Sequence, residues 1–140
     1  MEALEVSQTV LIVDDETLLL RTLSNALRDA GYEVLPAGSA GDGESLIERQ
    51  GGNVDLMVLD VKLPDRSGLD LLEAQRVRGY AGPVIVMTAF DNPESERRCR
   101  QLLVNHYLRK PFDLEAMLGL IRGLLGGSGS VAGSEVLGTN

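Results

Sequence analysis

Short apolar runs alternate with segments of helical period along most of this chain, and no other feature constrains its fold as strongly. Each run has the length of one strand and is too short for a buried helix. Between the runs, apolar residues recur every three or four positions, which is typical of helices that pack on one side. The runs cover residues 9–13, 32–37, 55–60, 82–89 and 106–111. Five strand–helix units in series predict an α/β fold, with helices on both faces of a parallel sheet.

Two prolines help to place the units. The run 32–37 is the weakest strand, and its Pro36 places it at an edge of the sheet or at the strand's end, because proline donates no backbone hydrogen bond. Pro93 opens a helix at its first turn, where the missing N–H costs nothing. The expected helices cover residues 16–30, a short segment between the glycines of 38–52, about 68–78, 93–104 and the segment after Asp113.

The length of the chain suits one domain with a proper hydrophobic core. We expect this single domain to cover residues 9–125, after an N-terminal extension, 1–8. Residues 126–140, GGSGSVAGSEVLGTN, have little to bury and no clear period. They predict a flexible tail or linker, which leads to an output domain or ends a stand-alone protein.

Charge and composition exclude several classes of partner. The formal net charge of −8 argues against nucleic acid and anionic membranes as partners of this domain. No apolar run approaches the ~20 residues that span a bilayer, and the N-terminus carries acids where a signal peptide would carry Lys or Arg. We expect a cytoplasmic protein, which its single cysteine, Cys99, also fits. We interpret Cys99 as a small helix residue rather than a reactive thiol.

Polar side chains stand at the carboxyl ends of the expected strands. They are Asp14 and Asp15 after the first strand, Asp60 on the third, Thr88 on the fourth and Lys110 on the fifth. In a parallel sheet these ends share one edge, so three carboxylates, a hydroxyl and an ammonium converge there. Carboxylates with room for water suit Mg²⁺, and no His or Cys cluster points to zinc. An aspartate beside Mg²⁺ and a lysine is also equipped to attack phosphorus.

Each of these residues has an ordinary structural explanation as well. Asp14 and Asp15 would suit the start of a helix, where acids cap backbone N–H groups. Thr88 suits any strand, Lys110 would serve as a surface lysine, and Tyr107 would serve as a partly buried aromatic residue. The occurrence of carboxylates, a hydroxyl and an ammonium at the ends of four of the five expected strands favours the site.

Four segments resemble a known family. VLIVDDE, DLMVLDVKLPDRSGLDLL, VIVMTA and YLRKPF are similar, in this order, to the motifs of the receiver domain of bacterial two-component response regulators. The resemblance covers about residues 9–125. It implies a flavodoxin-like, doubly wound (βα)5 fold with strand order 2-1-3-4-5.

The resemblance also implies a role for each residue of the site. Asp60 would accept a phosphoryl group from a sensor histidine kinase or a phosphotransfer protein. Asp15, Asp60 and the backbone carbonyl of Lys62 would bind Mg²⁺, and Asp14 would act through a water. Lys110 would pair with the phosphoryl oxygens. The domain would then catalyse only its own phosphorylation and dephosphorylation.

The same resemblance implies a switch. Thr88 would move toward the phosphoryl group on activation while Tyr107 turns inward. This change would act on the face made by the fourth helix, fifth strand and fifth helix, through which a homodimer would form. The bond between Lys110 and Pro111 would be cis.

Some positions depart from the family pattern. Lys62 and Phe90, two residues after Asp60 and Thr88, flank the path of water to an aspartyl phosphate, and we expect them to change its lifetime. Leu103–Val104 replaces the Gly-Ala pair of many members, so the loop there is expected to pack differently.

Other functions fit less well. A dehalogenase-type phosphatase would need a second aspartate where Lys62 stands, and a Rossmann domain would need G-x-G-x-x-G after the first strand. A receiver-like scaffold that binds protein partners without phosphorylation stays open.

Overall fold

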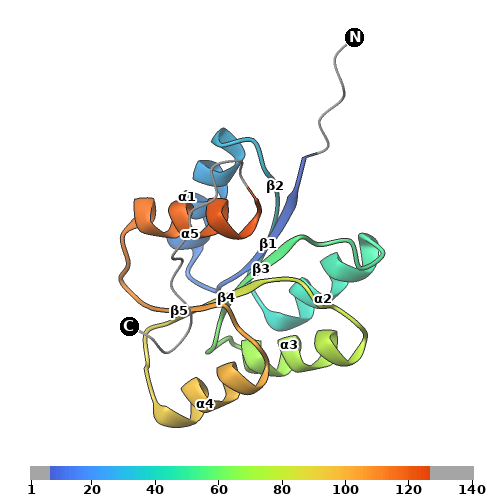
Figure 1. Ribbon diagram of the computed structural model, residues 1–140, viewed down its shortest axis with the longest axis vertical. Coiled ribbons are helices and arrows are strands. Elements are labelled where there is room, and N and C mark those ends of the chain that lie inside the picture. The colour runs from blue at the N-terminus through green and yellow to red at the C-terminus, as the bar shows by residue number, and fades with distance from the viewer. Residues whose placement is uncertain (1–6, 127–140) are drawn as a thin grey trace.

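The computed structural model describes residues 7–126, which form one parallel five-stranded sheet between two layers of helices (Figure 1). The strands run in the order β2-β1-β3-β4-β5. Their bounds are β1 Thr9–Val13, β2 Glu33–Ala37, β3 Leu56–Asp60, β4 Val84–Thr88 and β5 His106–Arg109. The predicted doubly wound fold and its strand order are confirmed.

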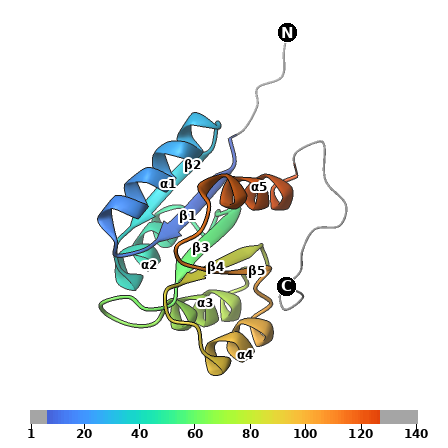
Figure 2. The ribbon, with the colours of Figure 1, turned by 90° about the vertical axis from the view of Figure 1, so that its left-hand side faces the viewer.

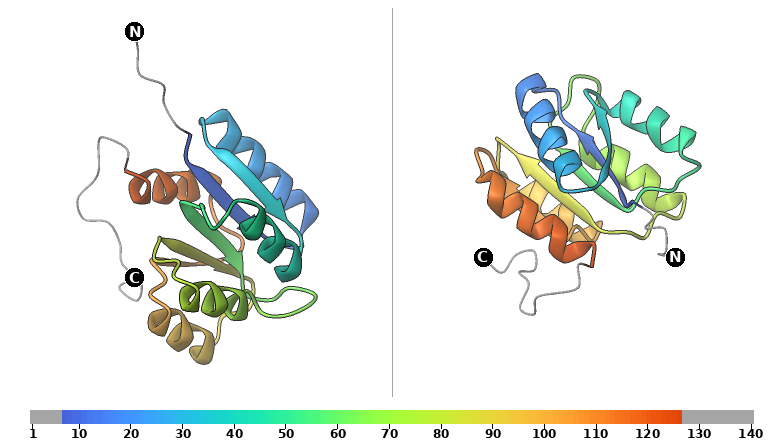
Figure 3. Two further views of the ribbon diagram at one scale, coloured as in Figure 1. Left: turned by 90° about the vertical axis from the view of Figure 1, so that its right-hand side faces the viewer. Right: turned by 90° about the horizontal axis from the view of Figure 1, so that it is seen from above.

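The five helices divide between the two faces of the sheet. Their bounds are α1 Thr17–Asp29, α2 Ala40–Arg49, α3 Gly68–Val77, α4 Pro93–Gln101 and α5 Leu114–Leu124. Helices α1 and α5 cover one face, and α2, α3 and α4 cover the other (Figures 1 and 2). Figure 3 shows the same two layers from two further sides. This arrangement leaves the carboxyl ends of the strands uncovered at one edge.

Alternate residues of the three central strands contribute to two separate cores. The core against α2, α3 and α4 contains Leu11, Val13, Met57, Leu59, Val84 and Val86. The core against α1 and α5 contains Val10, Ile12, Leu56, Val58, Ile85 and Met87. Because both faces are buried, these strands are apolar throughout instead of alternating. Pro36 lies on β2, an edge strand, as the sequence predicts.

Helix α4 contributes only small side chains to the buried interior. Its only buried residues are Ser95 and Cys99. Burial raises the pKa of the Cys99 thiol to about 12, so the thiol stays protonated, in keeping with a structural role. The guanidinium of Arg98 links α4 to α3, with Nη2 at 2.7 Å from both Asp70 Oδ1 and Glu73 Oε1.

The end of α4 explains one departure from the family pattern. We expected a helix as far as residue 104, but α4 ends at Gln101, because Leu103 adopts a left-handed conformation with φ of +63°. The N–H groups of Leu103 and Val104 donate to the carbonyls of Arg100 and Cys99, which is the Schellman pattern. Leu103 is exposed, whereas Val104 is buried in the core. A leucine therefore occupies a backbone position that favours glycine.

The predicted extension 1–8 and tail 126–140 fall almost entirely outside the described residues. Among the helices of residues 7–126, none has the length and apolar character needed to cross a bilayer.

The first helical residue of α3, Gly68, lies directly against the backbone of Asp60. Its N–H donates to the carbonyl of Val61 at 2.9 Å, and a Cβ at Gly68 would overlap the carbonyl oxygen of Asp60. We predict that Gly68→Ala lowers the free energy of unfolding by about 2 kcal/mol, because rigid backbone has to shift. Urea denaturation followed by circular dichroism measures this change.

Gly119 provides the matched control, because it lies exposed inside α5 with open space where a Cβ would stand. Gly119→Ala is expected to raise the free energy of unfolding by about 0.5–1 kcal/mol, since alanine favours helix. Equal effects of the two substitutions would contradict the steric argument.

Candidate functional site

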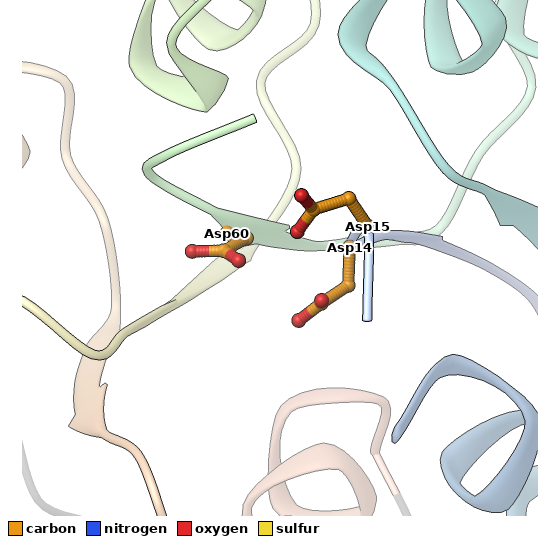
Figure 4. A group of neighbouring side chains, drawn as sticks. All are labelled: Asp14, Asp15 and Asp60. Carbon is orange, nitrogen blue, oxygen red and sulfur yellow. The ribbon is translucent and has the colours of Figure 1, made fainter. Parts of the chain in front are cut away.

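Three aspartates meet at the carboxyl edge of the sheet. Asp14 and Asp15 follow β1, and Asp60 ends β3, the neighbouring strand (Figure 4). One oxygen from each carboxylate lies within 4.8 Å of the other two. Asp14 and Asp60 are buried, whereas Asp15 is exposed. Parallel pairing of β1 and β3 therefore concentrates negative charge at a partly buried position.

The ammonium group of Lys110 contacts this cluster. Its Nζ lies 2.7 Å from Asp14 Oδ2, 3.0 Å from Asp60 Oδ2 and 2.9 Å from Glu16 Oε1. The backbone places it there, because the Lys110 N–H donates to the carbonyl of Thr88 at 2.8 Å and so extends the pairing of β5 with β4. The Lys110–Pro111 bond is cis, as the family resemblance implies.

Burial and charge oppose each other in this group. Burial raises the pKa of Asp60; the hydrogen bond from Lys110 acts against this effect, and the charge of Asp14 adds to it. The net result is a pKa above the ordinary value of about 3.8. Burial alone would lower the pKa of Lys110, but hydrogen bonds to Asp14, Glu16 and Asp60 outweigh it and raise that pKa. Lys110 is therefore held as a cation.

The donor set fits a hard divalent cation. All three clustered groups are carboxylates, the ligands that Mg²⁺ prefers, and Asp15 leaves space for water on the exposed side. Four carboxylates, of Asp14, Asp15, Glu16 and Asp60, surround the one ammonium of Lys110, and a divalent ion would offset the excess negative charge.

A pocket of about 270 Å³ opens beside Asp60. Its lining includes Asp15, Lys62, Phe90 and Lys110. The Lys62 N–H donates to Asp60 Oδ1 at 3.3 Å, while its ammonium lies 5.1 Å from the centre of the Phe90 ring. The two side chains that depart from the family pattern thus contact each other at the pocket wall.

Thr88 and Tyr107 have other partners than the aspartates. Thr88 Oγ1 donates to the Phe90 carbonyl at 3.1 Å and accepts from the Phe90 N–H at 3.0 Å. The Tyr107 hydroxyl donates to Asp91 Oδ1 at 3.0 Å, and Arg109 Nε lies 3.0 Å from Asp91 Oδ2. In this conformation both proposed switch residues are bound to the segment between β4 and α4.

Helix capping does not explain the acids. The N-cap residue of α1 is Glu16, whose side chain makes no capping hydrogen bond. Asp14 Oδ1 does accept from the Glu16 N–H at 2.7 Å, but its other oxygen pairs with Lys110. His106 is buried at the start of β5, away from this edge, and takes no part in the carboxylate cluster.

Our sequence analysis missed two acidic residues near the site. Glu16 directly follows Asp14 and Asp15 in the run DDE, and this position could have indicated that it lies near the site. Asp91 follows β4 in a segment without a recognisable pattern, so no sequence signal indicated that it binds Tyr107.

Because the pKa of Asp60 is raised, we predict that replacing its carboxylate by a neutral amide stabilises the protein, by an amount that depends on pH. In Asp60→Asn without divalent ions, we expect the free energy of unfolding at pH 7 to rise by about 1 kcal/mol, since the buried charge is lost. The cost of burying the charged Asp60 carboxylate is absent at a pH below the pKa of the unfolded state. It grows between the pKa values of the unfolded and folded states, and it is complete above the pKa of the folded state. The difference should therefore vanish at about pH 3.

Urea denaturation of both proteins at the two pH values measures this difference. A less stable Asp60→Asn protein at pH 7 would show that the ion pair with Lys110 outweighs the cost of burial.

Known proteins share this fold and these motifs. Residues 10–122 match the family model of the response regulator receiver domain. The chain is 38% identical over 117 residues to the probable transcriptional regulatory protein TcrX of Mycobacterium tuberculosis, which covers 84% of the chain and 49% of TcrX. It is 36% identical to the transcriptional regulatory protein PdtaR of the same organism, covering 83% of the chain and 56% of PdtaR. The chain thus spans about half the length of these curated relatives.

Solved structures agree with this match. The receiver domain protein (CheY-like) of Methanospirillum hungatei is 31% identical, with a TM-score of 0.80 over 86% of this chain and 94% of that chain. The chemotaxis protein CheY4 of Vibrio cholerae is 27% identical, with a TM-score of 0.77 over 86% of this chain and all of that one. Sequence, fold and acidic cluster agree, and the chain belongs to the receiver domain family of two-component response regulators.

Proposed function

We propose that this domain accepts a phosphoryl group on Asp60 from the phosphohistidine of a sensor histidine kinase or a phosphotransfer protein. The observation that carries the proposal is the contact of Lys110 Nζ with Asp60 Oδ2 at 3.0 Å, beside two further aspartates at an open pocket. A nucleophile, a cation to receive the phosphoryl oxygens and space for the transferred group are then together.

The transfer joins a carboxylate oxygen of Asp60 to phosphorus as the phosphorus–nitrogen bond of the phosphohistidine breaks, and the departing imidazole takes up a proton. Lys110 offsets the charge of the transferring oxygens. Dephosphorylation is the attack of water on the same phosphorus, which restores the Asp60 carboxylate and releases phosphate. The domain promotes only these reactions of its own side chain.

Asp15, Asp60 and the backbone carbonyl of Lys62 would hold Mg²⁺, and Asp14 would act through a bound water. The bound ion supplies positive charge for the phosphoryl oxygens in the transition state. The buried position of Asp14 and its contact with Lys110 suit an indirect role, because Asp14 Oδ2 is already paired at 2.7 Å.

We infer that Thr88 and Tyr107 form the switch. To reach a phosphoryl group on Asp60, Thr88 has to leave its two hydrogen bonds with Phe90. To turn inward, Tyr107 has to leave Asp91. Phosphorylation would favour the second arrangement and so change the α4–β5–α5 face, through which two copies would pair.

We also propose that the domain covers residues 9–125, preceded by the extension 1–8 and followed by a linker or tail, 126–140, and that it works in the cytoplasm. A net charge of −8 supports protein partners over nucleic acid or membranes.

Acetyl phosphate with MgCl₂ tests the reaction directly. We predict a mass increase of one phosphoryl group in intact-protein mass spectrometry, because the small donor needs only the receiver's own groups. Asp60→Asn should abolish the increase, and omission of Mg²⁺ should strongly reduce it.

Asp55→Asn is the matched control, since Asp55 precedes β3 at the opposite end of that strand and accepts from the Thr9 N–H. It should be phosphorylated like the unaltered chain. A chain that gains no phosphoryl group from acetyl phosphate or phosphorylated kinase would instead favour the scaffold function.

Lys62 and Phe90 are expected to control the lifetime of the phosphorylated form. Their contact at 5.1 Å lies on the wall of the pocket that water has to enter. We predict that Lys62→Asn accelerates dephosphorylation severalfold, because the shorter side chain leaves the Phe90 ring and opens the pocket. The loss of phosphorylated mass after removal of the donor gives the rate.

The control is Arg49→Asn, which removes an exposed positive charge at the far end of α2. Its dephosphorylation rate should equal that of the unaltered chain. An unchanged rate in Lys62→Asn would exclude Lys62 from the control of lifetime.

A further inference from the structure

The N-terminus of α2 is capped by a residue from a distant part of the chain. Asp65, in the loop between β3 and α3, accepts from the Ala40 N–H at 3.0 Å through Oδ1 and from the Gly41 N–H at 2.8 Å through Oδ2. Ser39, the N-cap residue, accepts from the Asp42 N–H at 3.1 Å. The first three N–H donors of the helix are therefore satisfied, two of them by Asp65.

The charge of Asp65 suits this position. Hydrogen bonds from Gly41 and Ala40 lower the pKa of Asp65 and keep its carboxylate ionised, and a negative charge is favourable at a helix N-terminus. Gly41 leaves room for the carboxylate, because a Cβ there would lie 3.2 Å from Asp65 Oδ2. The acidic side chain of Asp65 and the small residue Gly41 are thus both needed for this contact.

The loop that contains Asp65 also contains Lys62, whose backbone carbonyl is a proposed ligand of the ion. It runs from Asp60 to Gly68, and a backbone bridge between Lys62 and Ser67 closes it. At its start, the Lys62 N–H binds Asp60 Oδ1. At its tip, the next residue after Asp65 adds a second tie to α2, since Arg66 Nη2 lies 2.7 Å from Glu44 Oε1. Lys62, whose backbone is bridged to Ser67, thus belongs to the same short loop whose tip is held on α2.

We propose that Asp65 is a positioning residue for the divalent ion: by binding the N-terminus of α2, it fixes the loop that presents the Lys62 backbone to the cluster of Asp15 and Asp60. This inference rests on the proposed function of the site. Asp65 lies outside the cluster of Asp14, Asp15 and Asp60, so it would not itself be a ligand. Its loss leaves the tip of the loop tied to α2 by Arg66 alone, and so weakens binding of the ion without removing a ligand.

The test is a Mg²⁺ titration of the full chain and its variants, followed by the amide chemical shifts of Lys62 in ¹⁵N-labelled protein. We expect Asp65→Ala to bind Mg²⁺ about tenfold more weakly, the scale of effect known for residues that orient metal ligands. Asp65→Asn, which keeps one acceptor oxygen, should show a smaller loss. In phosphorylation by acetyl phosphate, both should need more Mg²⁺ yet approach the unaltered rate at saturation.

Ser39→Ala separates positioning from helix stability. It removes a cap from the same end of α2 but leaves the loop tied, so its Mg²⁺ affinity should equal that of the unaltered chain while its denaturation midpoint falls. Equal affinity in Asp65→Ala and the unaltered chain, or an equal loss in Ser39→Ala, would overturn the inference. Failure of the unaltered chain to bind Mg²⁺ would instead overturn the proposed function itself.

Discussion

The contact of one ammonium group with buried carboxylates is the interaction on which this site depends. Lys110 lies within 3.0 Å of Asp14 and Asp60, and without it two buried acids would repel each other at short range. The contact exists only because β1, β3, β4 and β5 run parallel, so that residues far apart in the chain end at one edge. Even with Lys110 present, the pKa of Asp60 stays above its ordinary value. The sheet thus holds in place a group that would be more stable uncharged.

Much of this architecture could be predicted from the sequence, for physical reasons. Strands buried on both faces are apolar throughout, which made the three central strands easy to recognise. The order of the strands could not be predicted in this way, because the alternation of strands and helices does not encode which strands are neighbours. Only the family resemblance supplied the order. The end of α4 was also missed, because Leu102, Leu103 and Val104 continue an apolar spacing while the backbone at Leu103 leaves the helix.

In the site, too, some residues could be predicted from the sequence and others could not. Asp14, Asp60 and Lys110 were found because a strand end fixes the backbone from which each side chain projects. Asp65 and Asp91 were not found, because their partners lie in other loops and helices. A side chain that reaches across loops depends on the packing of both elements, and no local pattern records it. Thr88 was identified as a residue, but its hydrogen bonds to Phe90 depend on the backbone turn that follows β4.

The weak burial of α4 has a mechanical consequence. A helix that contributes only Ser95 and Cys99 to the buried interior gains about 1–2 kcal/mol from that burial, far less than a helix anchored by leucines. The burial energy lost on displacing α4, apart from the ion pairs of Arg98 with Asp70 and Glu73, is therefore comparable with one or two hydrogen bonds. The rearrangement of Thr88 that we propose would break two hydrogen bonds, which is on the same scale. Displacing α1, with Leu23 and Leu27 fully buried, would cost more. Among the described helices, α4 therefore loses the least buried apolar surface when it is displaced.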